Sequence, residues 1–331
     1  MAFSCTITVS ALIPGHFYLP HEDVFQDAFE SKASSGDIVP TFAFLLEHPS
    51  HGKYMFDLGL RKHGKGYPPA WDETLEEFKP DCSQDVCDIL RANRVEPTEI
   101  KGVIFSHLHF DHTGDIEPFT SAEIILGIDA KPLFDSPYPE DPESLFPDWP
   151  KGRIVRYLEY SDDTETETYQ TQVTTESPTE SLVMSSSSHP LPRFTKAFDF
   201  FGDQSLLIID APGHFPGHLM ALARVSERPP TNRTSTSGTS IYVLLAGDCC
   251  HNRECYSPGT RLISQANYED VAVARETVAS LIRTVKEMPN VVVVLAHEKE
   301  LENEGMPLLP DSLNEWAVKQ VAERISERGH N

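Results

Sequence analysis

The chain of 331 residues carries a formal net charge of −24, and 39% of its residues are hydrophobic. This acidic excess argues against a nucleic-acid partner, whose phosphates are bound by Lys and Arg, and it weakly favours a neutral, cationic or small substrate. No stretch of 18 apolar residues occurs, and residues 1–20 lack the basic and apolar regions of a signal peptide. We therefore expect no membrane partner and a cytoplasmic location. The six cysteines do not suggest a disulfide framework in a chain of this length.

Apolar runs and alternating patterns predict eleven strands along the chain. They are Cys5–Ile13, Pro40–Glu47, Tyr54–Asp57, Gly102–Phe105, Glu123–Leu126, Arg153–Leu158, Thr195–Phe200, Ser205–Ile209, Leu219–Val225, Ile241–Ala246 and Val291–Ala296. Apolar residues at spacings of three and four predict three helices, Gln84–Arg94, Asn267–Met288 and Asp311–Arg328. A continuous apolar stripe on a helix of this kind indicates a face that packs on a sheet.

Two segments interrupt this pattern. Residues 160–192 are rich in Ser, Thr and Glu, with too few apolar residues to offset the entropy of ordering, and we interpret them as a mobile surface insertion. Residues 227–240 form a second, shorter loop that contains two adjacent prolines. Both segments lie between predicted strands, so we expect them to decorate one domain and not to separate two.

Four residues suited to metal binding lie within six positions, in the run Ser-His-Leu-His-Phe-Asp-His-Thr-Gly at 106–114. They are His107, His109, Asp111 and His112. The run follows the predicted strand Gly102–Phe105, so the cluster lies where a strand ends. Imidazole and carboxylate together suit Zn²⁺, and also Mn²⁺, Fe²⁺ or Co²⁺.

Further candidate ligands follow other predicted strands. His214 and His218 occur in Gly-His-Phe-Pro-Gly-His after Ser205–Ile209, and Asp248 and His297 come directly after the strands that end at Ala246 and Ala296. Each candidate therefore lies on the same kind of sheet edge as the first cluster.

Together these positions resemble the metallo-β-lactamase superfamily, whose pattern is His-x-His-x-Asp-His followed by His, Asp and His. The resemblance extends from about Cys5 to about Ile325. It includes Asp57, in an Asp-x-Gly turn that supports the metal loop. It implies an α/β fold, the αββα sandwich of two mixed sheets flanked by helices, formed as a single domain by residues 1–331.

The resemblance also implies two divalent metal ions, with Zn²⁺ the expected metal. The implied ligands are His107, His109 and His218 for the first ion, Asp111, His112 and His297 for the second, and Asp248 as a bridge. His214 would then have a supporting or structural role. Two neighbouring ions lower the pKa of a shared water toward neutrality, which yields a hydroxide nucleophile at pH 7.

Within the superfamily, Leu108 and Phe110 make the first cluster similar to N-acyl homoserine lactone lactonases. This implies a quorum-quenching enzyme that opens a lactone ring, with Asp111, Asp248 and His251 as catalytic residues. Lactone-opening members carry a Tyr three residues after the bridging Asp, and that position is His251 here. Either His251 or Tyr256 would donate a hydrogen bond to the substrate carbonyl.

Other functions stay open at this point. A thioesterase acting on glutathione or acyl-carrier thioesters needs the same nucleophile and Lewis acid, and so does a β-lactam hydrolase. A different class is represented by a non-catalytic metal-binding module or a flavodiiron-type oxidoreductase. The module would be expected to have lost ligands, and the oxidoreductase needs a flavin domain. Each enzymatic alternative implies a small-molecule partner, and the oligomeric state is not determined by the sequence.

Overall fold

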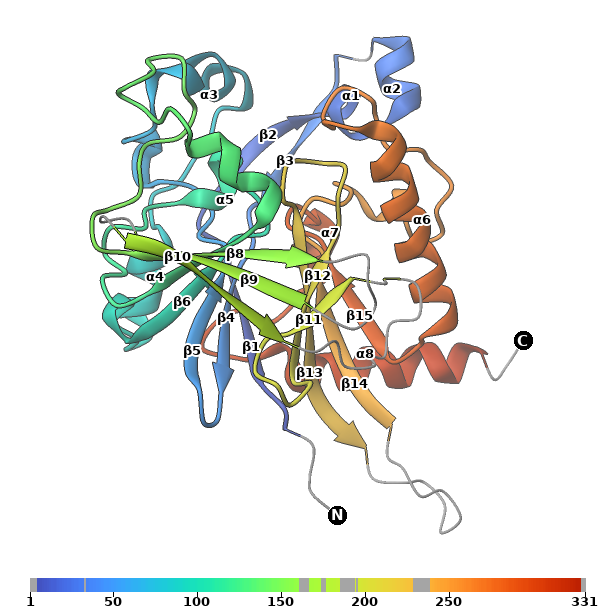
Figure 1. Cartoon of the computed structure of the whole chain (residues 1–331). Coiled ribbons are helices and arrows are strands. Elements are labelled where there is room, and N and C mark those ends of the chain that lie inside the picture. Colours follow the sequence, from blue (N-terminus) through green and yellow to red (C-terminus); the bar gives the residue numbers. More distant parts are fainter. Residues whose placement is uncertain are drawn as a thin grey trace.

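The computed structural model describes residues 5–32, 34–160, 167–173, 177–184, 194, 196–228 and 239–328. Two large β-sheets pack face to face, with helices on the outer face of each (Figure 1). A two-stranded sheet lies apart from them, made of β2 (His16–Pro20) and β3 (Gly36–Pro40).

The first sheet has the strand order β1-β4-β5-β6-β7-β8-β9-β10. Its strands are β1 (Thr8–Leu12), β4 (Ala43–His48), β5 (Gly52–Phe56), β6 (Ile100–Ile104), β7 (Glu123–Gly127), β8 (Ile154–Tyr160), β9 (Glu167–Val173) and β10 (Ser177–Met184). Strands β5 to β8 run parallel to one another, and the remaining pairs are antiparallel.

The second sheet has the order β11-β12-β13-β14-β15. Its strands are β11 (Ala197–Asp199), β12 (Leu206–Asp210), β13 (Leu219–Arg228), β14 (Thr239–Leu245) and β15 (Val291–Val294). Only the last pair, β14 and β15, is parallel. All eleven predicted strands are therefore present, with shifted ends.

Alternate residues of the central strands serve different layers of the core. In β12, Leu206 and Ile208 pack between the two sheets, whereas Leu207 and Ile209 pack toward the outer helix. This two-residue period follows from the pleat, and strands buried on both faces read as continuous apolar runs. The arrangement confirms the predicted αββα sandwich.

Three long or medium helices match the predicted ones: α4 (Val86–Ala92), α6 (Val271–Glu287) and α8 (Leu313–Arg328). Helix α6 buries Ala274, Val278 and Leu281 against the second sheet, as its apolar stripe predicts. Helix α8 contributes Leu313, Ala317 and Val321 to the buried core that both sheets share.

The remaining helices were not predicted from periodicity. The short α-helices are α1 (His21–Val24), α2 (Gln26–Ser31), α3 (Asp72–Phe78), α5 (Phe110–Thr113) and α7 (Lys299–Asn303). The 3₁₀ helices are η1 (Lys62–Gly64), η2 (Pro69–Trp71), η3 (Pro97–Glu99), η4 (Ile128–Phe134) and η5 (Arg253–Cys255). Elements of one or two turns do not repeat an apolar pattern often enough to be recognised.

The predicted insertion at 160–192 is partly wrong, because it contains regular structure. Strands β9 and β10 pair as an antiparallel hairpin that extends the first sheet from β8. Their Thr, Val and Tyr residues favour strands, and a hairpin needs no core of its own to pair with an existing edge. Residues 161–166, 174–176 and 185–192 of the predicted insertion, and 229–238 of the second predicted loop, lie outside the described residues.

All six cysteines are free, so the prediction that they form no disulfide framework is confirmed. Within the described part of the chain, no helix has both the length and the apolar character needed to cross a membrane.

Candidate metal centre

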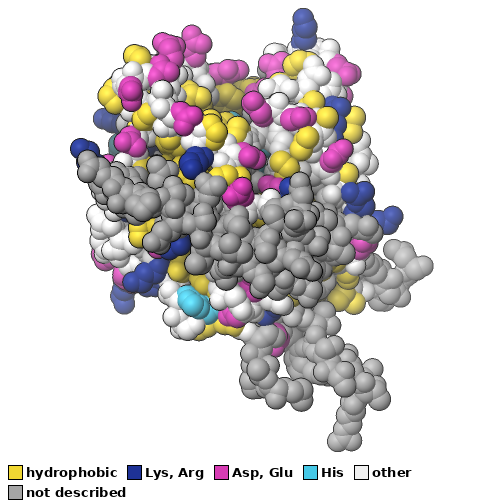
Figure 2. Space-filling model, in the orientation of Figure 1, with side chains coloured by type: hydrophobic (Ala, Val, Ile, Leu, Met, Phe, Trp, Pro, Cys, Tyr) yellow, Lys and Arg dark blue, Asp and Glu magenta, His cyan; other side chains and the backbone are white. Residues whose placement is uncertain are grey.

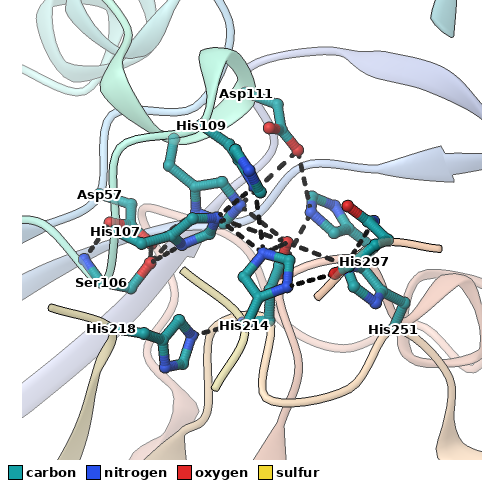
Figure 3. Close-up of polar contacts among 12 residues, drawn as sticks. Asp57, Ser106, His107, His109, Asp111, His214, His218, His251 and His297 are labelled. Carbon is teal, nitrogen blue, oxygen red and sulfur yellow. Dashed lines mark hydrogen bonds and ion pairs between the residues drawn. The ribbon is translucent and has the colours of Figure 1, made fainter. Parts of the chain in front are cut away.

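The candidate ligands meet at one edge of the two sheets because each follows a strand. Ser106 and His107 follow β6, His214 follows β12, Asp248 follows β14 and His297 follows β15. Parallel β5 and β6 in one sheet, and parallel β14 and β15 in the other, deliver their following loops to the same end (Figure 3). Asp111 and His112 lie on the single-turn helix α5 directly after His109.

The first ligand set consists of His107, His109, His214 and Asp248, whose candidate atoms lie within 4.8 Å of one another. Nε2 of His107 is 3.0 Å from Nδ1 of His109, and Nε2 of His214 is 3.2 Å and 3.1 Å from these two nitrogens. Tetrahedral nitrogen ligands about 2.0–2.1 Å from a Zn²⁺ ion are roughly 3.3 Å apart. The three imidazoles therefore fit one divalent cation.

The second ligand set consists of Asp111, His112, Asp248 and His297. Nε2 of His297 lies 3.0 Å from Oδ2 of Asp111 and 3.3 Å from Oδ1 of Asp248. Nε2 of His112 lies 3.3 Å from Oδ2 of Asp248. Asp248 is buried, and among the described residues it is the side chain common to both sets, in a position suited to bridging two cations.

Two observations test whether these residues fit metal ions. Nε2 of His112 and Oδ1 of Asp248 are buried and have no hydrogen bond of acceptable geometry among the described residues. Burial, together with neighbouring imidazoles, holds the pKa of His107 and His214 well below the usual value, so both rings are neutral as metal ligands must be. Both observations fit a site for cations.

The two carboxylates of the second ligand set favour a positive charge close to them. Burial lowers the pKa of His297, but the carboxylates of Asp248 and Asp111 outweigh it and raise the value to about 10. Without a cation, the cluster thus retains a proton between its carboxylates. A divalent ion supplies that positive charge instead, which is the exchange of protons for metal expected at such sites.

The outer ring nitrogens of four histidines are held by hydrogen bonds. Nδ1 of His112 donates to Oδ2 of Asp57 at 2.9 Å, and Nδ1 of His107 lies 3.0 Å from the Ser106 hydroxyl, which itself donates to Asp57 at 2.7 Å. Nδ1 of His214 donates to the Asn267 carbonyl, and Nδ1 of His297 to the Pro40 carbonyl. Such partners fix the tautomer and the ring orientation of a ligand, and Asp57 has the supporting role that the sequence predicts.

The structure does not bring the predicted ligand His218 into either ligand set, and His214 lies there instead. Nδ1 of His218 donates to the Ala211 carbonyl at 2.9 Å, and its Nε2 accepts from the Asp248 backbone N–H at 3.0 Å. Both ring nitrogens are therefore used, and the ring lies away from the convergent group (Figure 3). Gly213 has φ +119°, and a Cβ there would lie 2.2 Å from the Ala274 backbone nitrogen, so only glycine lets this loop approach α6 and present His214.

His251 lies beside the two ligand sets. Its Nε2 is 3.2 Å from Oδ2 of Asp248, and its Nδ1 is 3.1 Å from the Tyr268 hydroxyl. Tyr256, the predicted alternative donor, is buried and donates to Glu298 at 3.3 Å, so that alternative is wrong. Tyr268 is not among the predicted site residues, because the predicted helix Asn267–Met288 includes it, whereas the observed α6 begins only at Val271.

A cavity of about 300 Å³ opens onto these groups. We call its metal-binding side the floor, formed by His109, Asp111, Asp248, His251 and His297. We call a second group of its lining residues the wall: Phe17, Leu19, Asp23, Trp71, Glu77 and Phe78. The floor and wall meet where the Phe17 ring packs edge-on against His297, with centroids 4.9 Å apart.

A profile of the Metallo-beta-lactamase superfamily matches residues 36–221, more than half of the chain. The fold and this match define a protein of α/β architecture with the metallo-beta-lactamase fold. The chain belongs to the metallo-beta-lactamase superfamily, as its sequence motifs predict.

Two relatives and one solved structure illustrate the similarity. Gamma-lactamase FDB1 of Fusarium pseudograminearum is 30% identical over 232 residues, which cover 64% of this chain and 45% of that protein. N-acyl homoserine lactonase AttM of Rhizobium radiobacter is 27% identical over 195 residues, covering 58% and 62% respectively. The chain thus spans less than two thirds of either relative. A crystal structure of B. thuringiensis AiiA with bound N-decanoyl-L-homoserine matches 94% of this chain and 100% of that one, with TM-score 0.60 and 18% identity, and shares its fold.

Proposed function

We propose that the chain is a dinuclear metal-dependent hydrolase that opens a lactone ring. The observation that carries this proposal is the sharing of Asp248 by two ligand sets on the floor of a cavity of about 300 Å³. That volume is at the low end of small-molecule sites and suits a compact ring. The aromatic side chains of the wall favour an uncharged ring over an anionic one, and the lactonase AttM supports the ester class.

The proposed ligands are His107, His109 and His214 for one ion, Asp111, His112 and His297 for the other, and Asp248 between them. Zn²⁺ is the expected ion, because imidazole and carboxylate together are common zinc ligands. Two bound ions would supply a water of lowered pKa as nucleophile and a Lewis acid for the substrate carbonyl.

The chain's own groups would position and protonate the substrate. When the Tyr268 hydroxyl donates to Nδ1 of His251, Nε2 of that ring carries the proton, and the contact with Asp248 keeps it beside the cavity. That N–H can donate to the substrate carbonyl as negative charge develops on it. Asp111 also lines the cavity, where its carboxylate can pass a proton to the leaving oxygen.

A γ-lactam is the second candidate substrate, favoured by the 30% identity to gamma-lactamase FDB1. Opening a lactam makes the same demands on the nucleophile and on the carbonyl donor. It differs in the leaving group, because an amide nitrogen must gain a proton as the bond breaks, whereas a lactone oxygen can leave with less assistance. The lactam reaction would thus depend more strongly on Asp111.

The test is an activity panel on zinc-loaded protein, with γ-lactones, γ-lactams, a thioester and a chromogenic β-lactam. In ¹⁸O water, we expect the lactone to yield a ring-opened acid that carries the label in its carboxylate. If γ-lactams alone are opened, the second candidate replaces the first. If only the thioester or the β-lactam is cleaved, both candidates fail.

A further inference from the structure

Asp23, an acidic side chain of the wall, has no hydrogen-bond or ion-pair partner among the residues that the structure describes. Asp23 lies on α1, is partly buried and lines the cavity together with Glu77 of α3. Among the described residues, no hydrogen bond or ion pair involves the Asp23 carboxylate; only burial and more distant charges act on it. A carboxylate that lines the cavity is available to a bound molecule.

Two other acidic residues of the same segment, Asp27 and Asp37, are paired. Asp27 accepts from Arg261 at 2.8 Å, and Asp37 binds His21 at 2.9 Å and Lys299 at 2.6 Å. Basic side chains therefore lie near this segment, but none of those that the structure describes forms an ion pair with Asp23.

The surroundings of Asp23 oppose a bare negative charge. Apolar Leu19, Phe17 and Phe78 line the same wall. Burial, and then the Glu77 carboxylate, raise the pKa of Asp23 to about 6, and His251 lowers it in part. Keeping an unpaired carboxylate here destabilises the empty cavity, so a ligand that neutralises it gains binding free energy from that relief.

Acidic side chains are also frequent, among some Lys and Arg, on the upper part of the molecule (Figure 2). Acidic side chains stand on both upper lobes of the molecule, over α3 on one side and over α1 and α2 on the other, with apolar side chains between them (Figure 2). The net charge of −24 adds to this field. Such a potential raises the local concentration of cations and repels anions.

We propose that Asp23 determines substrate specificity by binding a positively charged nitrogen, carried by the substrate away from its reacting carbonyl. The floor would hold the ring carbonyl, while the carboxylate of Asp23 and the ring faces of Phe17 and Phe78 would surround the cationic group. Aromatic rings stabilise such cations through their quadrupoles. This inference rests on the proposed function of the cavity and names the substrate class more narrowly.

The test uses two γ-butyrolactones of nearly the same shape, one bearing a trimethylammonium group and the other a tert-butyl group. For the zinc-loaded protein, we expect a kcat/KM for the cationic lactone at least tenfold above that for the neutral one. Asp23→Asn should abolish this preference mainly through a higher KM, with kcat changed less than about twofold. Glu22→Gln, on the same helix but outside the cavity lining, is the matched control and should retain the preference.

A second measurement separates this inference from the proposed function. The two corresponding tetrahydrofurans lack the carbonyl and cannot be hydrolysed, so calorimetry reports their binding without turnover. If no lactone is opened, the proposed function fails, while tighter binding of the cationic tetrahydrofuran that is lost in Asp23→Asn still supports the role of Asp23. Equal binding of the two compounds, or an equal loss for both in Asp23→Asn, would overturn it.

Discussion

The floor of the cavity and its wall differ in how their side chains are held. Imidazoles of the two ligand sets, such as His214 and His297, use one ring nitrogen toward the cluster and the other for a hydrogen bond to a protein oxygen. In the wall, Phe17 and Phe78 are held by ring packing, with centroids 6.0 Å apart, and Asp23 has no described partner. The side chains of the floor are therefore held in one arrangement by hydrogen bonds. Substitutions in the wall can change which ligand binds without moving the groups of the floor.

The largest expected effect comes from a substitution in the floor. Asp248→Asn keeps the shape but removes the negative charge that both ligand sets share, so we expect loss of metal and a fall in kcat/KM of about 10³-fold or more. Elemental analysis and turnover of the same preparation provide the measurement. Asp23→Asn is the matched control, since it removes a carboxylate from the wall and should keep the full metal content. Full metal and activity in Asp248→Asn would show that Asp248 is not the bridge.

The next effect distinguishes the two histidines of the Gly-His-Phe-Pro-Gly-His loop. His214→Ala should remove about one metal equivalent and lower kcat by roughly 10²-fold or more, because it removes one of three convergent imidazoles. His218→Ala should keep most of the metal and instead destabilise the fold by about 1–3 kcal/mol, because it leaves the buried Asp248 N–H without its acceptor. Metal content and urea unfolding of both variants decide the matter. The opposite pattern would restore His218 as the ligand.

A smaller effect lies where the floor meets the substrate. His251→Phe removes the donor beside Asp248 without removing a member of either ligand set. We expect kcat to fall by about 10–100-fold while the metal content stays unchanged. Tyr268→Phe should give a weaker loss in the same direction, because it removes only the group that sets the His251 tautomer. Unchanged kinetics in His251→Phe would leave this residue without a catalytic role.

The floor could be predicted because its information is local in the sequence. Each ligand directly follows an apolar strand, so periodicity places the strand and residue type identifies the ligand. The choice between His214 and His218 could not be made in this way, because the contacts that occupy the His218 ring come from Ala211 and Asp248, seven and 30 residues away. Both histidines stand in the same Gly-His context, and only the folded structure separates them.

The wall could not be predicted from the sequence. Strand β2 is five residues long and ends at Pro20, and α3 spans seven residues, so neither shows a repeated apolar pattern. Phe17 and Phe78, 61 positions apart, meet only because these two elements pack together. Selectivity therefore depends on tertiary contacts between short elements, whereas the metal ligands follow continuously apolar, recognisable strands such as β12 and β15.

The smallest expected effect concerns the free energy of unfolding that is lost because Asp23 is partly buried without a partner among the described residues. The pKa of Asp23 is about 6 in the folded chain and about 3.9 in an unfolded one, so between these values the folded state binds the extra proton. Stability therefore falls as pH rises from about 4 to 6, and the full cost is present above pH 6. Groups that act on this carboxylate are Glu77, Glu22 and His251.

Asp23→Asn removes that cost, and we expect it to raise Tm by about 1–2 °C at pH 7 and to leave Tm unchanged near pH 4. The measurement uses chelator-treated protein, in which no bound cation adds to the field at Asp23. Glu22→Gln, as control, should give a smaller pH-dependent gain, because Glu22 is the weakest of the groups that act on Asp23. A variant that is more stable yet selects less well for the cationic lactone would show that this carboxylate is kept for binding, at the expense of the fold. A lower Tm at pH 7 would instead mean that Asp23 stabilises the wall, and its charge would then need a structural explanation.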